Sequence, residues 1–252
     1  MRIYFRGNLY GCNQATAFVE DKGKIIFIGS DKEALKYSGE QIDLNNKYVY
    51  PGFNDSHMHL VNYGQSLKNV LLEKHTNSLK ALLEELKKHL VKGQWLIGRG
   101  WNHDYFTDEQ RFPTRKDLDM ISEEEPIVIT RTCGHILVAN SKAIELANIT
   151  SEAVEGGYFD LDAGLFQENA LYLIYDTIPQ PTIEEIKDNI LIAQKELHSY
   201  GITSVQSDDL LSATSDYHDA LQAFEQLRAE NKLTIRAVSY THLRAHETCA
   251  DL

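Results

Sequence analysis

The sequence contains few cysteines, and they are scattered. Its 252 residues include three, Cys12, Cys133 and Cys249. An odd number at wide spacing argues against a disulfide framework and is typical of proteins in a reducing compartment. The sequence therefore predicts a cytoplasmic protein.

Long apolar runs are also missing. No stretch of 18 or more apolar residues occurs, which argues against a membrane-spanning helix. The first residues, MRIYFRGNLYGCNQA, lack the continuous apolar segment of a secretory signal. We therefore expect neither a leader peptide nor a role at a membrane.

Basic residues are the third shortage. The 25 lysines and arginines face 37 aspartates and glutamates, for a formal net charge of −12. Such a surface repels nucleic-acid phosphates and anionic lipids, so binding to either is not expected. Length and apolar content instead allow one large α/β domain or two smaller ones.

Local patterns predict a mixed α/β fold. Residues 1–50 alternate β-forming stretches with turn signals, including DKGK, which is typical of a hairpin. Leucines at helical spacing follow the potential cap Ser78. A capping box, TIEE, starts another helix at Thr182, and Gly201 should end it. The strands GITSVQ and LTIRAV then flank a further helix, which is the pattern of a βαβ unit.

The stretch PGFNDSHMHL, residues 51–60, places two histidines two positions apart. Alternate residues of a strand face the same side, so His57 and His59 would project together with Met58 opposite. Two imidazoles on one face can bind one divalent metal, zinc being the usual partner of such nitrogens. The spacing alone is also compatible with two exposed or core histidines.

The surrounding residues strengthen the metal interpretation. PGFNDSHMH resembles the first-strand motif of the amidohydrolase superfamily, PGF-x-D-x-H-x-H. The later stretches GRGWNHDYF, RTCGHILVANSKAIE and GLFQENA resemble the branch called amidohydrolase family 3, which includes N-substituted formamide deformylases. The resemblance extends from about residue 1 to about residue 238.

The resemblance implies a fold and a chemistry. It implies a TIM barrel beside a small β-sandwich, and hydrolysis of amide-type carbon–nitrogen bonds by metal-activated water. His57 and His59 would be first-strand metal ligands. Asp55 would occupy the acidic position of the motif, and we interpret it as a supporting or structural residue.

Other polar residues are candidates for a substrate pocket. Trp101 and His103 could line it, although an aromatic cluster that closes the core is the alternative, which we favour for Tyr105 and Phe106. Arg131 and His135 flank Cys133 at the end of an apolar strand, so all three would share a face. Arg131 and His135 could hold the polar end of a substrate, the alternative being a strand-end pair that satisfies local carbonyls. We interpret Cys133 as an inert core thiol.

One carboxylate and one helix cap complete the candidates. Glu168 lies alone in an apolar setting, which suggests a role near the metal, the alternative being a solvent-facing side chain. Asn140 should cap the helix that follows it.

The expected domains are incomplete. Residues 1–50 would form part of the β-sandwich and residues 51–238 part of the barrel, with an insertion near residues 100–180. Residues 239–252 have the character of a non-native tail, and His242 and His246 there lack the glutamate of a zinc-protease motif.

Three barrel strands can be placed, where a complete barrel has eight. The later ligands that the resemblance implies, a lysine, two histidines and an aspartate, cannot be matched. We therefore expect an inactive N-terminal fragment of a metal-dependent hydrolase for small amide-type molecules. The alternative is a non-catalytic α/β protein that binds metal weakly or not at all. The oligomeric state is left open, with a homo-oligomer of the full-length parent among the alternatives.

Overall fold

The computed structural model describes residues 1–75, 77–209 and 216–239. Within these ranges, no helix is long and apolar enough to cross a membrane. The chain divides into two compact units. The first comprises Met1–His57, Leu197–Gln206 and Ile235–Val238, and the second is built mainly from Met58–Glu196 and Ser207–Thr234.

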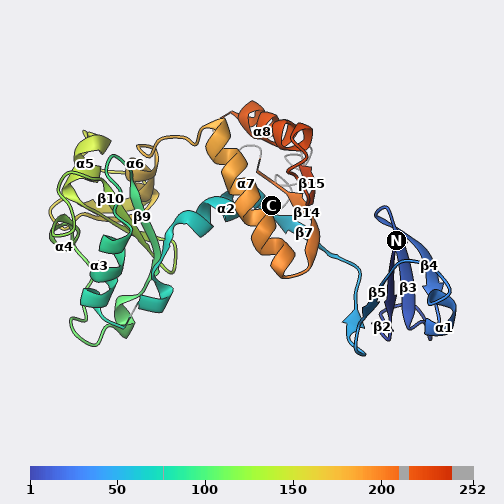
Figure 1. The fold of residues 1–252 in the computed structure, drawn as a ribbon. Helices are drawn as coiled ribbons and strands as arrows, with labels where there is room; N and C mark the ends of the chain where they lie inside the picture. The colour runs from blue at the N-terminus through green and yellow to red at the C-terminus, as the bar shows by residue number, and fades with distance from the viewer. Residues whose placement is uncertain (76, 210–215, 240–252) are drawn as a thin grey trace, which may run out of the picture. The chain divides into compact units, whose positions relative to one another are not determined.

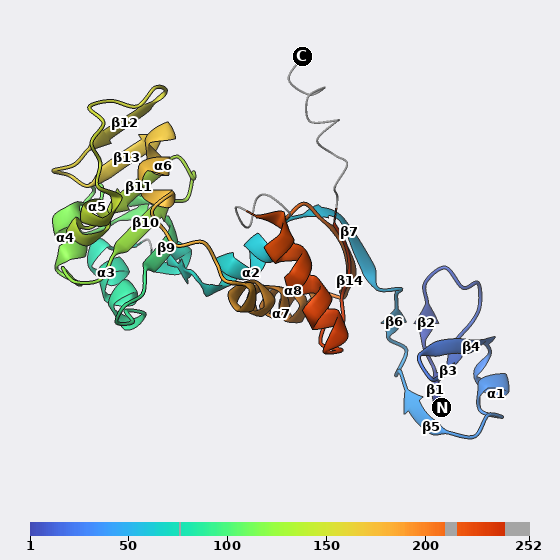
Figure 2. The same ribbon diagram turned by 90° about the horizontal axis from the view of Figure 1, so that it is seen from above.

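A four-stranded sheet of order β4-β3-β1-β5 opens the first unit (Figure 2). The predicted hairpin is confirmed, because β3 and β4 are antiparallel and Asp21 pairs with Lys24. Ile3, Ala17, Val19 and Ala34 form the core of this sheet. The elements are β1 (Arg2–Phe5), β2 (Asn8–Leu9), β3 (Ala17–Asp21), β4 (Lys24–Gly29), α1 (Asp31–Ala34), β5 (Glu40–Asp43) and β6 (Tyr48–Val49).

The expected barrel strands form a three-stranded sheet of order β15-β14-β7. Its strands are β7 (Phe53–Met58), β14 (Ile202–Ser207) and β15 (Arg236–Ser239). β7 and β14 run parallel: Phe53 N donates to Gly201 O near their beginnings, and Asp208 N donates to Met58 O at their ends. β15 begins later than LTIRAV suggests, because the Gln194 side chain holds the backbone and hydroxyl of Thr234 before the strand.

A six-stranded sheet of order β12-β13-β11-β10-β9-β8 lies in the second unit, with α3 to α6 gathered around it (Figure 1). Buried apolar side chains fill two clusters, one that includes Trp101 and Ile129 and another that includes Val128 and Phe166. Strands β12 and β13 form an antiparallel hairpin within the stretch GGYFDLDAGLFQENA. The strands are β8 (Val70–Leu71), β9 (Leu96–Trp101), β10 (Ile127–Arg131), β11 (Ile136–Ala139), β12 (Gly157–Asp160) and β13 (Leu165–Glu168).

Helix starts follow the capping signals. Ser78 Oγ accepts from Ala81 N, and Thr182 and Glu185 form the predicted capping box. Asn140 caps α5 as expected and is fully buried. The remaining elements are α2 (Leu60–Lys68), η1 (Leu72–His75), α3 (Leu79–Lys88), η2 (His103–Tyr105), α4 (Arg115–Asp119), α5 (Ser141–Ala147), η3 (Asn169–Leu171), α6 (Tyr172–Tyr175), α7 (Ile183–Ser199) and α8 (Tyr217–Ala229).

Candidate metal centre

The histidine pair lies where β7 ends. The predicted extended backbone is confirmed through Met58, and His57 is the next-to-last residue of the strand. His59 stands one residue beyond it, as the N-cap of α2, with φ −114° and ψ 88°. His57 is exposed and His59 is half-buried. The strand places both imidazoles at its C-terminal end, and a shared face stays a prediction.

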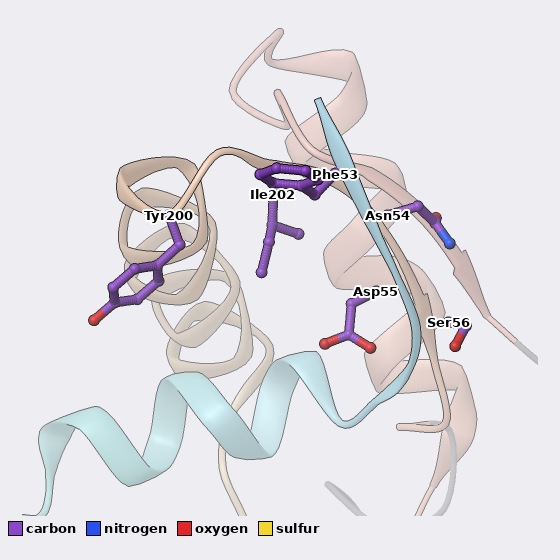
Figure 3. A pocket seen from close by; sticks show the side chains of 6 residues that line it. All are labelled: Phe53, Asn54, Asp55, Ser56, Tyr200 and Ile202. Atoms are coloured by element: carbon purple, nitrogen blue, oxygen red, sulfur yellow. The ribbon is translucent and has the colours of Figure 1, made fainter. Parts of the chain in front are cut away.

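Asp55 binds the backbone near the end of the strand, and its role beside a metal ligand stays a prediction. Its carboxylate accepts a hydrogen bond from His57 N at 3.1 Å. Figure 3 shows Asp55 on the opposite side of β7 from Asn54 and Ser56, and the same alternation assigns His57 to the side of Asp55. An open pocket of about 390 Å³ runs along this strand. It is lined by Phe53, Asn54, Asp55, Ser56, Tyr200 and Ile202.

The imidazole of His59 is held by the neighbouring strand. Its Nδ1 lies 2.6 Å from the carbonyl oxygen of Asp208. Because a carbonyl oxygen only accepts, Nδ1 of the neutral ring carries the proton and Nε2 carries the lone pair. Metal-binding histidines commonly donate their second ring N–H to a carbonyl or carboxylate in this way. The contact therefore fits His59 as a metal ligand.

Sequence reasoning missed Ser207 and Asp209, which are both fully buried beside His59. Burial raises the pKa of Asp209, and hydrogen bonds from Ser207 and from the backbone of α2 oppose the rise. The signal that could have found them is SDD, a run of polar residues directly after the strand GITSVQ. Polar groups at the C-terminal ends of parallel strands are typical of active sites.

The expectation of a shared face for Arg131, Cys133 and His135 is wrong. β10 ends at Arg131, and the chain then turns through Gly134, whose φ is +80°, into β11. Alternation applies only while the backbone is extended, so the three side chains do not follow one strand face. Arg131 instead pairs with Asp104 at 2.8 Å and donates to Asn102.

Cys133 is exposed rather than a core thiol. Partial burial tends to raise its pKa, but a backbone hydrogen bond from His135 and the Arg131 guanidinium outweigh that effect. The pKa of the thiol is therefore lowered. The expectation of a core thiol is wrong because Cys133 lies in the turn after the apolar strand and not in the strand itself.

His135 and Glu168 come together. His135 Nδ1 lies 2.9 Å from Glu168 Oε2, and both side chains are more than half exposed. Glu168 has φ +54° and ψ −129°, a conformation that costs free energy in a residue with a side chain and often occurs at functional sites. Glu168 is thus both exposed to solvent and in contact with His135, and its role near a metal stays a prediction.

Trp101 and His103 lie at the end of β9. Trp101 is fully buried, so it supports the strand end from inside the core, and the His103 ring packs edge-on against Phe112 with 4.4 Å between centroids. The expected aromatic closure of the core is confirmed for Phe106, which is buried, but is wrong for Tyr105, which is 66% exposed. Tyr105 ends a short 3₁₀ turn that carries its ring outward.

The metal site is incomplete in the part of the chain that the structure describes. No group of three or more histidine, cysteine, aspartate or glutamate side chains there could hold a metal ion. A catalytic zinc site normally has three protein ligands. The donors of His57 and His59 fit such a site as two members of a larger set. His242 and His246 lie outside the described residues, as does the expected non-native tail except for Ser239.

Comparisons with known proteins agree with the motif. The chain is similar to YtcJ, a Bacillus subtilis protein named as an amidohydrolase, with 31% identity over 96% of this chain and 47% of the relative. It is 30% identical to the N-substituted formamide deformylase of Arthrobacter pascens over 59% of this chain and 29% of that enzyme.

A solved structure agrees as well. An uncharacterized metal-dependent hydrolase from Pyrococcus furiosus superposes with a TM-score of 0.75 at 30% identity, covering 100% of this chain and 52% of the other. The chain thus spans about half the length of YtcJ and of this hydrolase. The mixed α/β fold, which includes a small sheet and a first part of a barrel, is consistent with that coverage.

The family model described as the amidohydrolase family matches residues 40–251. The match enters residues 239–252, whose non-native character stays a prediction. It covers well over half of the 252 residues, and the chain therefore belongs to the amidohydrolase family.

Proposed function

We propose that this chain is the N-terminal part of a hydrolase that cleaves carbon–nitrogen bonds of small amide-type molecules, with His57 and His59 as two ligands of a divalent metal. The observation that carries the proposal is the 2.6 Å contact of His59 Nδ1 with the Asp208 carbonyl, which directs the lone pair to Nε2. Imidazole nitrogens favour zinc among the common hydrolytic metals. When bound, the metal supplies a nucleophilic water at neutral pH and polarises the substrate carbonyl.

The residues of the chain have separate roles in this proposal. Asp55 holds the backbone of His57, and Asp208 holds the ring of His59. The Arg131–Asp104 and His135–Glu168 pairs offer charged groups at strand ends, and we propose that they bind polar parts of the substrate.

Zinc binding tests the metal assignment. We expect the purified chain to bind zinc and each of the variants His57→Ala and His59→Ala to lose that binding, as measured by competition with a chromophoric chelator. His89→Ala is the matched control, because His89 is exposed at the end of α3 and paired with Glu85. Zinc binding that survives in both histidine variants would contradict the proposal, and a wild-type chain that binds no zinc would favour the non-catalytic alternative.

A further inference from the structure

Three consecutive residues at the C-terminal end of β14, the β14 clamp (Ser207, Asp208 and Asp209), bind five consecutive residues of the segment from β7 into α2. The clamp contacts are Asp208 N to Met58 O at 2.9 Å, His59 Nδ1 to Asp208 O at 2.6 Å, Leu60 N to Ser207 Oγ at 2.9 Å, Val61 N to Asp209 Oδ2 at 3.0 Å and Asn62 N to Asp209 Oδ1 at 3.5 Å. Hydrogen bonds to the clamp therefore hold His59, the residue before it and the three residues after it.

The beginning of α2 depends on this clamp. His59 is its N-cap, and its side chain makes no capping hydrogen bond to the helix. Histidine is not among the preferred N-cap residues, and the first N–H groups of a helix need acceptors. Ser207, the last residue of β14, and Asp209, two residues beyond it, supply these acceptors, so the backbone that follows His59 is attached to the end of β14.

The clamp is also buried and internally connected. Ser207 and Asp209 are fully buried, and the Ser207 hydroxyl donates to the Asp209 carboxylate. A buried carboxyl group is costly unless it is hydrogen-bonded. Here the N–H groups at the start of α2 and the Ser207 hydroxyl donate hydrogen bonds to the Asp209 carboxylate. These bonds stabilise the carboxylate and hold its orientation. The clamp can therefore fix the backbone near His59 more rigidly than a solvent-exposed cap.

We infer that Ser207 and Asp209 are positioning residues for the metal site. They fix the backbone on the C-terminal side of His59, and Asp208 fixes the backbone on its N-terminal side. The imidazole is thereby held in a single tautomer and orientation. The inference rests on the proposed role of His59 as a ligand. Neither residue would contact the metal; each acts through His59.

Histidine ring NMR tests the positioning role without metal. In the metal-free chain at fixed pH, long-range ¹H–¹⁵N spectra should show His59 with its proton on Nδ1. Ser207→Ala and Asp209→Asn should shift these signals toward a mixture of tautomers. Ser78→Ala and Asp216→Asn, which alter caps of α3 and α8, should leave them unchanged. If Asp209→Asn fails to fold, Ser207→Ala, which removes only a hydroxyl, still tests whether the clamp positions His59.

Zinc affinity is the second readout. We expect Ser207→Ala to weaken binding roughly 10- to 100-fold, the range found when partners of metal ligands are removed, while the Ser78→Ala control binds as the wild type does. Unchanged ring signals and unchanged affinity in the clamp variants would overturn the inference. If the wild-type chain binds no zinc, the proposed function fails, and the ring signals alone then decide whether the clamp positions His59.

Discussion

Gly64 shows how much a single missing side chain can matter. It lies in the middle of α2, where a Cβ atom would come within 2.0 Å of the Asn189 carbonyl oxygen in α7. The obstructing atoms are backbone, which cannot move aside as a flexible side chain can. The absence of a side chain therefore lets the two helices approach closely.

We predict that Gly64→Ala destabilises the chain although alanine is the better helix former. Alanine gains about 1 kcal/mol of helix propensity. Overpacking against backbone should cost about 3 kcal/mol, the upper part of its usual range. The net loss in the free energy of unfolding is then about 2 kcal/mol. Urea unfolding measures it, with Lys68→Ala on an exposed position of the same helix as control. A more stable Gly64→Ala variant would show that the helices do not meet here.

Helix α3 depends on an acid distant in sequence. Asp108 accepts hydrogen bonds from Leu79 N at 2.9 Å, from Lys80 N at 3.0 Å and from the Ser78 hydroxyl at 2.8 Å. The two backbone bonds are the main reason that the pKa of Asp108 lies well below its usual range. Two side chains, one local and one distant, thus share the cap of this helix.

The pH dependence of Asp108→Ala follows from that shift. A carboxyl group whose pKa is lower in the folded state stabilises that state above its unfolded pKa, which is about 3.9, and loses the effect as the pH falls. We predict that Asp108→Ala lowers the unfolding temperature at pH 7 and that the difference from wild type shrinks steadily below about pH 4. Thermal scans across this range measure it, and Glu123→Gln at an exposed position is the control. A difference that stays constant down to low pH would contradict the capping role of the carboxylate.

In the part of the chain that the structure describes, neither edge of the three-stranded sheet pairs with a further strand. Its outer strands are β7 and β15, and they carry the exposed apolar residues Phe53 and Val238, at 53% and 58% exposure. Open edges and apolar surface favour association over a preorganised site. The chain spans about half the length of YtcJ and of the Pyrococcus furiosus hydrolase.

We predict that the 252-residue chain alone has no measurable hydrolase activity. The described residues offer two family-type ligands, and a catalytic zinc needs three together with a water. Hydrolysis of N-formyl and N-acyl amines by the purified chain with added zinc tests this, beside the double variant His57→Ala, His59→Ala. Turnover in the wild type that disappears in the double variant would mean that the ligand set is larger than counted.

Local signals account for much of the fold. The capping residues Ser78 and Thr182 mark the starts of α3 and α7, and the hairpin at Asp21 forms as its turn chemistry predicts. The strand that carries His57 follows from PGFNDSHMHL because Pro-Gly, β-forming residues and alternation act within a few positions. Such interactions are visible in one sequence.

The environment of the histidines was not predictable in this way. Sequence by itself determined the family, the extended strand and the choice of His57 and His59 as proposed ligands, because these depend on residue type and short spacing. Tertiary structure alone decided that Asp208 orients His59, that Ser207 and Asp209 hold α2, and that Cys133 lies in an exposed turn. The physical reason is distance along the chain: the β14 clamp is separated from His59 by almost 150 residues, and only folding brings a buried carboxylate to a helix N-terminus.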